Sequence, residues 1–127
     1  MKIEHVALWT RDIERSKQFY ETYFGGVAGE KYTNPAHQFE SYFLQFEDGA
    51  RLEIMQMPGI IDGVATQQAM GWVHIAFSTG SKANVDALTQ QLQQGGYPVA
   101  DGPRTTGDGY YESVVLDPDG NRVEITI

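Results

Sequence analysis

Hydrophobic and polar residues alternate along the chain in a pattern that its second half repeats. Residues 3–9 and 72–78 alternate between the two kinds of residue, which predicts half-buried β-strands. The two segments correspond position by position, and His74 in the second matches His5, 69 positions earlier. Self-similarity at a fixed period reveals an architecture before any single element does. The chain is therefore predicted to contain two copies of one module.

A helix is predicted after each of these strands. Asp12 can cap a helix whose apolar residues recur at helical spacing, and Gly25-Gly26 ends it. Ser81 can cap the second helix, which ends at Gly95-Gly96. The aromatic residues of the first helix are predicted to lie in the core: Phe19, Tyr20, Tyr23 and Phe24. The two helices therefore occupy equivalent places in the two modules.

Each module then closes with an alternating strand pair, joined through an Asp-Gly turn to a last strand. They are predicted over residues 41–46 and 48–54 in the first module, and 111–116 and 119–125 in the second. The last strands have nearly the same sequence, and Glu124 matches Glu53, 71 positions earlier. This order of elements is βαβββ in both halves.

The pattern accounts for the whole chain as one α+β domain. Two βαβββ modules cover about 1–55 and 71–127, and a linker of about 56–70 joins them. Polar residues at 29–40 and glycines at 101–109 predict loops. If the helices cover the apolar faces of the strands, the opposite faces form a curved sheet around a concave site, with the helices on the convex side.

Strand parity places four polar residues on the face opposite the helices, because successive side chains point to opposite sides of a sheet. In the first strand of each module, His5 and His74 oppose the apolar residues. In the last strand, Glu53 and Glu124 do the same. One such residue would have an ordinary structural explanation, but an inward glutamate repeated in both modules has no backbone reason. The four are therefore candidates for one shared site.

Two imidazoles and two carboxylates suit a divalent metal. They balance the charge of the ion, and nitrogen and oxygen donors favour Ni²⁺, Co²⁺ or Zn²⁺, with Fe²⁺ and Mn²⁺ as further candidates. Four protein ligands leave two positions of an octahedral shell for water or substrate. Such a metal can stabilise an enediolate while a neighbouring carboxylate moves a proton. This is sufficient for isomerase chemistry.

Other conspicuous side chains are given structural roles. His37 has no counterpart in the second half and is predicted to lie on the surface of a polar loop. Arg51 and Arg122 are predicted to form ion pairs. Three side chains are expected to line the cavity, where an aromatic wall can also hold a substrate tail: Trp9, Met55 and Trp72.

The composition of the chain limits the classes of partner that we expect it to bind. With 127 residues, 41% of them hydrophobic, the chain can form one globular domain. Nine Lys and Arg against 17 Asp and Glu give a net charge of -8, the wrong sign for nucleic acid or anionic lipid. The absence of cysteine leaves histidine and carboxylates as metal ligands. No leader or long apolar run is found, so we expect a cytoplasmic protein with a small-molecule partner.

The motifs around these residues resemble the vicinal oxygen chelate superfamily over essentially the full chain. The resemblance rests on Ile-Glu-His-Val-Ala around His5, Asp-Ile-Glu-Arg-Ser-Lys-Gln-Phe-Tyr in the first helix, Trp-Val-His-Ile-Ala-Phe around His74, and Asp-Pro-Asp-Gly-Asn-Arg-Val-Glu ending at Glu124. The superfamily includes glyoxalase I, fosfomycin-resistance transferases, methylmalonyl-CoA epimerase, extradiol dioxygenases and bleomycin-binding proteins. It implies a single domain over 1–127 but no single activity, because one scaffold hosts many functions.

The ligand set is similar to that of bacterial glyoxalase I, lactoylglutathione lyase, which isomerises the hemithioacetal of methylglyoxal and glutathione. By that resemblance His5, Glu53, His74 and Glu124 would hold the metal. Glu53 and Glu124 would be the catalytic carboxylates, with Glu124 the base for the C1 to C2 proton shift. The resemblance also implies a homodimer with its site at or near the module interface, the ligand pairs coming from one subunit or from two.

One position departs from glyoxalase I. Trp9 stands where that enzyme commonly carries an arginine that contacts the glutamyl carboxylate of glutathione. The implied substrate is therefore a hemithioacetal or a related α-oxy carbonyl compound, with the thiol left open.

Other superfamily functions stay open as alternatives. A metal-independent small-molecule binding protein of the bleomycin-resistance type is favoured by the aromatic wall and the acidic charge, but that type typically lacks the ligands found here. The epimerase usually carries glutamine at the position of Glu53. Dioxygenases and fosfomycin-type transferases generally use three protein ligands, and a fourth inward carboxylate argues against both.

Overall fold

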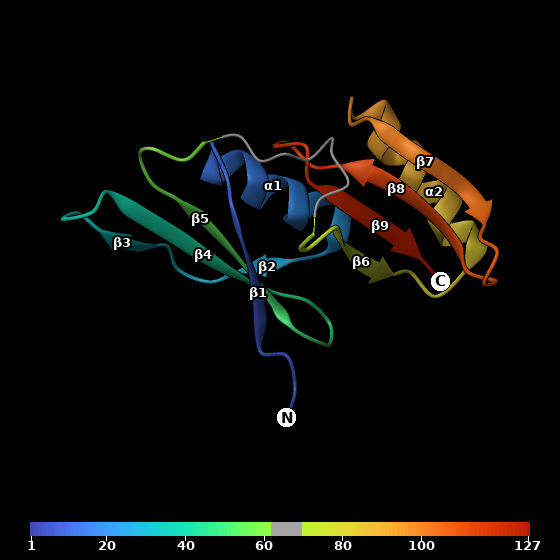
Figure 1. Ribbon diagram of the computed structural model, residues 1–127, viewed down its shortest axis with the longest axis horizontal. Coiled ribbons are helices and arrows are strands. Elements are labelled where there is room, and N and C mark those ends of the chain that lie inside the picture. Colours follow the sequence, from blue (N-terminus) through green and yellow to red (C-terminus); the bar gives the residue numbers. More distant parts are fainter. Residues whose placement is uncertain (62–69) are drawn as a thin grey trace. The chain divides into compact units, whose positions relative to one another are not determined.

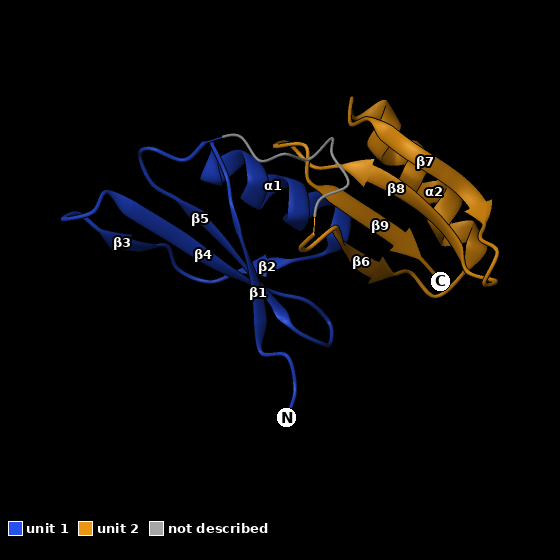
Figure 2. Cartoon of the chain, viewed as in Figure 1, with its two compact units in different colours: residues 1–63 blue, residues 64–127 orange. Residues whose placement is uncertain are grey.

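A computed structural model describes residues 1–61 and 70–127 (Figure 1). The chain divides into two compact units, residues 1–63 and 64–127 (Figure 2). Most of the predicted linker, residues 62–69, lies outside the described residues.

Unit 1 is a helix packed on a mixed sheet. Its elements are β1 (His5–Trp9), α1 (Ile13–Phe24), β2 (Val27–Ala28), β3 (Tyr32–Asn34), β4 (Phe39–Gln45) and β5 (Arg51–Gln56). The strand order is β1-β5-β4-β2, and β3 also pairs with β4. β1 runs parallel to β5, whereas β4 and β5 are antiparallel. The first and last strands of the unit are thus neighbours.

Unit 2 repeats this arrangement. Its elements are β6 (His74–Ser78), α2 (Lys82–Gln94), β7 (Val99–Thr105), β8 (Tyr111–Leu116) and β9 (Arg122–Thr126). The order β6-β9-β8-β7 again places the first strand parallel to the last. Unit 2 is a βαβββ module as predicted, and unit 1 has the same order of elements with one additional short strand, β3. The α+β fold of two modules predicted from the sequence is therefore confirmed.

Both helices begin at the predicted caps. The side chain of Asp12 accepts a hydrogen bond from the backbone N–H of Arg15, and Ser81 accepts one from Asn84. These bonds satisfy backbone donors that the first helical turn leaves without a partner. At the end of α1, Gly25 takes a left-handed conformation with φ 68°, which a residue without a Cβ adopts at little cost.

The core of each unit lies between its helix and one face of its sheet. α1 packs on β4 and β5, and α2 packs on β7, β8 and β9. The buried apolar side chains of unit 1 include Ile13, Phe19, Tyr20, Leu44, Leu52 and Ile54. Those of unit 2 include Val85, Leu92, Val115, Val123 and Ile125. Tyr23 and Phe24 of α1 are partly exposed, so of the four predicted aromatic core residues two are fully buried.

Two predicted loops contain strands. Residues 32–34 of the polar segment pair with β4 as β3, and most of the glycine-rich segment 101–109 belongs to β7. β7 is an edge strand whose pairing with β8 shifts register around Gly102 and Pro103. Glycine and proline are tolerated at such irregular edges, so their presence there did not indicate a loop.

No helix in the described ranges is long and apolar enough to cross a membrane.

Candidate functional site

One face of each sheet lies opposite its helix, and we call it the site face. In β5, Leu52 and Ile54 are buried under α1, which leaves Glu53 and Met55 on the site face. The same alternation in β1 exposes His5, Ala7 and Trp9 more than Val6 and Leu8. Strand parity therefore assigned the faces of unit 1 correctly.

His5 and Glu53 lie side by side on the site face of unit 1. Parallel pairing sets Ala7 directly beside Glu53, and His5 is two residues earlier on the same strand. The imidazole Nε2 reaches to 3.9 Å from the Glu53 carboxylate, whose side chain is 15% exposed. Because Ala7 carries only a methyl group, it leaves space beside the carboxylate. Phe43 of β4 lies opposite Glu53 on its other side.

His74 and Glu124 form the matching pair on the site face of unit 2. Ala76 pairs with Glu124, as Ala7 does with Glu53. His74 Nε2 lies 3.4 Å from the Glu124 carboxylate, whose side chain is 16% exposed. On the opposite side, Val114 of β8 pairs with Glu124. Each carboxylate is thus set between a small side chain and an apolar one.

Glu4 fixes the orientation of His5 by contacting Nδ1, while the other ring nitrogen, Nε2, is the one nearer to Glu53. The Glu4 carboxylate accepts a short hydrogen bond from Nδ1 of His5 and another from Nε of Arg51 at 2.8 Å. Hydrogen bonding to His5, followed by the contacts with Arg51, lowers the pKa of Glu4. With the proton on Nδ1, Nε2 keeps its lone pair toward Glu53, as a ligating histidine requires. The ion pair predicted for Arg51 is thereby confirmed.

An aromatic ring supports the same group. The ring of Phe43 meets the imidazole of His5 edge-on, with 5.3 Å between their centroids. The Arg51 guanidinium lies 4.2 Å from the centroid of the same ring. His5 therefore contacts a carboxylate on one side and an aromatic ring on another, and both contacts favour the observed orientation of the imidazole.

Glu112 was missed by the sequence analysis. It belongs to the site face of unit 2, two residues before Val114 on β8, and Val114 is the register partner of Glu124. Burial raises the pKa of Glu112, and the charge of Glu124 raises it further. The Arg104 guanidinium, held by Asp101, lies 3.9 Å from Glu112. Finding Glu112 requires the register between β8 and β9, which the sequence does not state.

The four predicted ligands are thus found as two pairs, one in each unit. Within the described part of either unit, no three histidine, aspartate or glutamate side chains are arranged to hold a metal ion. A site of four ligands needs both pairs, and it stays a prediction.

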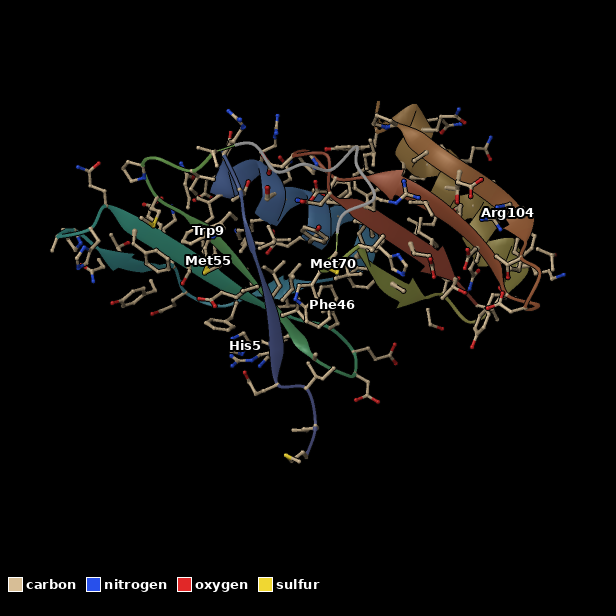
Figure 3. The ribbon with its side chains drawn as sticks, in the orientation of Figure 1. His5, Trp9, Phe46, Met55, Met70 and Arg104 are labelled. Carbon is tan, nitrogen blue, oxygen red and sulfur yellow. The ribbon has the colours of Figure 1, made fainter. Side chains whose placement is uncertain are left out.

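The remaining predicted residues are placed as follows. Trp9 and Met55 are register partners at one end of the sheet of unit 1, and His5 lies farther along β1 (Figure 3). His37 is exposed in a turn, as predicted. Trp72 precedes β6 and is 95% exposed.

Comparison with known proteins decides the family. The sequence model of the Glyoxalase/Bleomycin resistance protein/Dioxygenase superfamily matches residues 2–125. The chain belongs to this superfamily. Proteins of the superfamily commonly bind divalent metals, and those with the glyoxalase fold are often dimers that act on small molecules.

Two relatives and one solved structure illustrate the match. The chain is 28% identical to the uncharacterized protein YqjT of Bacillus subtilis, covering 97% of this chain and 96% of the relative. It is 30% identical to the uncharacterized protein YwbC of the same species, covering 97% and 94%. It is similar to the trypanothione-dependent glyoxalase I of Leishmania major, with a TM-score of 0.78, 21% identity, and coverage of 99% of this chain and 86% of that one. At 21% identity, the similarity to this solved structure supports the fold alone.

Proposed function

We propose that this protein is a divalent-metal-dependent lyase or isomerase of the glyoxalase I type, acting on a hemithioacetal or a related α-oxy carbonyl compound. The observation that carries the proposal is the same His–Glu pair on the site face of both units. In this proposal the two pairs, His5 with Glu53 and His74 with Glu124, hold one ion together. The neighbouring functions of the superfamily are less well supported, because they generally use fewer carboxylates.

The donor set fits such an ion. In each pair an imidazole nitrogen faces a carboxylate oxygen, at 3.9 Å in unit 1 and 3.4 Å in unit 2. Neighbouring ligands of one ion, each about 2.1 Å from it, lie roughly 3–3.5 Å apart, so small side-chain rotations would suffice. Ni²⁺, Co²⁺ and Zn²⁺ suit this combination of nitrogen and oxygen donors, and Fe²⁺ or Mn²⁺ also accepts it.

The chain itself would supply the proton transfer. When bound, the metal contributes the positive charge that stabilises a substrate oxygen becoming negative. Glu124 takes a proton from one carbon of the substrate and returns it to the adjacent carbon, so the reaction is a net isomerisation without oxidant or reductant. Val114 and Phe43 limit water beside the two glutamates, which favours proton return to carbon.

The proposal includes a homodimer with its site at or near the interface between modules, and a cytoplasmic location. Dimers are common among glyoxalase-fold proteins, which supports the first point. The negative charge of the chain supports a small-molecule partner over nucleic acid or membrane.

Metal analysis and turnover test the proposal together. We expect purified protein reconstituted with Ni²⁺, Co²⁺ or Zn²⁺ to retain the ion through desalting and to isomerise the hemithioacetal of methylglyoxal with at least one member of a panel of thiols that includes glutathione. Glu124→Gln should bind substrate but lose at least about a hundredfold in kcat, the usual scale for removing a catalytic base. His37→Ala, which changes the exposed third histidine, should behave as wild type. Failure to bind any divalent ion, or full turnover by Glu124→Gln, would contradict the proposal.

A second candidate function is metal-independent binding of a cationic aromatic drug, as in bleomycin-resistance proteins. It is favoured by Trp9, whose indole is 43% exposed on the site face, and by the net charge of -8. Stoichiometric binding of bleomycin that persists in excess chelator would support it. Loss of that binding in chelator, or its absence, would favour the metalloenzyme.

A further inference from the structure

The two site faces are alike at their His–Glu pairs and differ in the next row of residues. In unit 1 that row is formed by Trp9 and Met55, which are register partners. At the equivalent place in unit 2, Ser78 pairs with Thr126. The two units therefore share the candidate ligands but present an apolar surface beside one pair and hydroxyl groups beside the other.

Further aromatic side chains extend the apolar row of unit 1. The indole of Trp9 meets the ring of Phe39 nearly perpendicularly, with 6.1 Å between centroids. Phe39 in turn meets Tyr32, again at 6.1 Å. These contacts hold the indole from one side, yet 43% of Trp9 is exposed. A supported aromatic ring that stays exposed can receive another flat group by stacking or edge contact.

A cavity of about 290 Å³ lies against Trp9. Its lining consists of uncharged residues: Trp9, Met57, Pro58, Gly59, Ile60 and Ile61. The guanidinium of Arg51 also belongs to the site face of unit 1. It lies on the other side of Glu53 from Trp9 and donates a hydrogen bond to Glu4. Among the described residues that line this cavity no side chain is positively charged, so a negatively charged group would lose hydration there without gaining an ion pair, whereas an apolar group would gain contact area.

Strand geometry sets the reach of such a group. Met55 is two residues beyond Glu53 on β5, which places its row about 7 Å away along the strand. A substrate held by its oxygens at Glu53 would therefore reach the Trp9 row through a link of a few bonds. A substrate with a longer tail would have to extend past the row formed by Trp9 and Met55.

We propose that the substrate carries an uncharged, flat apolar group, aromatic or unsaturated, a few bonds from its paired oxygens, and that this group packs on Trp9 and Met55. This inference rests on the proposed function and names its substrate class. Trp9 is then a specificity residue that selects against substrates carrying a carboxylate at this place, glutathione adducts included.

Three small hydroxamates test the inference, because each offers the same pair of oxygens with a different tail. They are acetohydroxamate with a methyl group, phenylacetohydroxamate with a ring, and succinic monohydroxamate with a carboxylate. With metal-loaded wild-type protein, titration calorimetry should give about tenfold tighter binding of the phenyl probe than of the methyl probe, the scale of one aromatic contact. The carboxylate probe should bind more weakly than the methyl probe.

Substitutions at Trp9 form the second part of the test. Trp9→Ala should reduce the preference for the phenyl probe to within about twofold, and Trp9→Phe should keep most of it. Trp9→Arg should reverse the order and favour the carboxylate probe. Tyr110→Ala, which removes another exposed aromatic ring outside the described strands, is the control and should leave all three affinities unchanged.

The outcomes separate this inference from the proposed function. If metal is bound and the three probes bind wild type equally, or if Trp9→Ala and Trp9→Arg keep its preference, the inference is wrong and the metal site stands. If elemental analysis finds no metal and none of the probes binds, the proposed function fails and this inference fails with it.

Discussion

Glu4 lies just before the first strand and holds His5 through Nδ1, on the side of the ring away from Glu53. Carboxylates in this position orient a metal-ligating imidazole and raise its basicity. We predict that Glu4→Gln lowers the affinity for Zn²⁺ or Ni²⁺ by about tenfold without unfolding the protein. Competition with a chromogenic chelator measures this directly. Glu47→Gln, at an exposed turn, is the matched control, and equal affinities of the two variants would contradict the role of Glu4.

A second residue-scale prediction concerns pH. The Glu14 carboxylate lies 2.7 Å from Nζ of Lys31 and accepts a hydrogen bond from the hydroxyl of Tyr42 at 3.1 Å. The hydrogen bond with Lys31, followed by that from Tyr42, lowers the pKa of Glu14 below its ordinary value of 4.5. A carboxyl whose pKa is lower in the folded state stabilises that state above its unfolded pKa, and this contribution is lost as pH falls through the folded value.

Lys31→Gln should therefore reduce the free energy of unfolding at pH 7 by no more than about 0.5 kcal/mol, because Glu14 is largely exposed. The difference from wild type should shrink as the pH falls below 4.5 and Glu14 becomes protonated. Urea unfolding at pH 7 and at a series of acid pH values measures it, with Lys2→Gln near the amino terminus as the control. A difference that grows in acid would show that the sign is wrong.

At the scale of elements, the edge strand β7 depends on Gly102. This glycine has φ 75°, and a Cβ placed on it would lie 2.5 Å from the backbone oxygen of Glu112 and 3.0 Å from the Cα of Ser113. Gly107, in the following turn, has open space around it. We expect Gly102→Ala to lower the free energy of unfolding by about 2 kcal/mol or more, and Gly107→Ala by less than about 1 kcal/mol. Chemical unfolding monitored by circular dichroism tests both, and equal effects would contradict the close approach.

The elements that the sequence predicted well are those with local causes. Asp12 and Ser81 cap helices through bonds to residues three positions later, so their role can be seen in a short window. β3 and the irregular part of β7 exist because β4 and β8 lie beside them, and no local pattern describes that partner.

The candidate site divides in the same way. Parity within one strand is a local property, and it correctly assigned His5, Glu53, His74 and Glu124 to the faces opposite the helices. Glu4 precedes His5 in the sequence, but no local pattern shows that it binds Nδ1 of His5 while Arg51 of β5 holds it there. Glu112 comes near Glu124 only through the pairing of β8 with β9. Sequence patterns could therefore identify the candidate ligands but not the side chains that orient and surround them.

At the scale of the molecule, the two-pair proposal predicts a stoichiometry. If one ion needs both His–Glu pairs, wild-type protein should bind one divalent ion per chain, whether the pairs come from one subunit or two. His5→Ala alone and His74→Ala alone should then each abolish tight binding. Elemental analysis after desalting checks this, with His37→Ala as the control. Two ions per chain in wild type, with one left in each variant, would mean that each unit binds its own metal.

Parallel pairing of first and last strands also affects how each unit folds. His5 meets Glu53 only after the chain has closed a loop of 48 residues, and His74 meets Glu124 after one of 50. When two contacting residues lie so far apart in the sequence, the chain loses loop-closure entropy before the contact can stabilise the fold. Such contacts therefore slow folding. A ligand that bridges these residues ties the two ends of a unit together and acts on the opening step. The bound protein should therefore owe its persistence in the cell to slow unfolding, and resistance to proteolysis should follow the supply of the ligand.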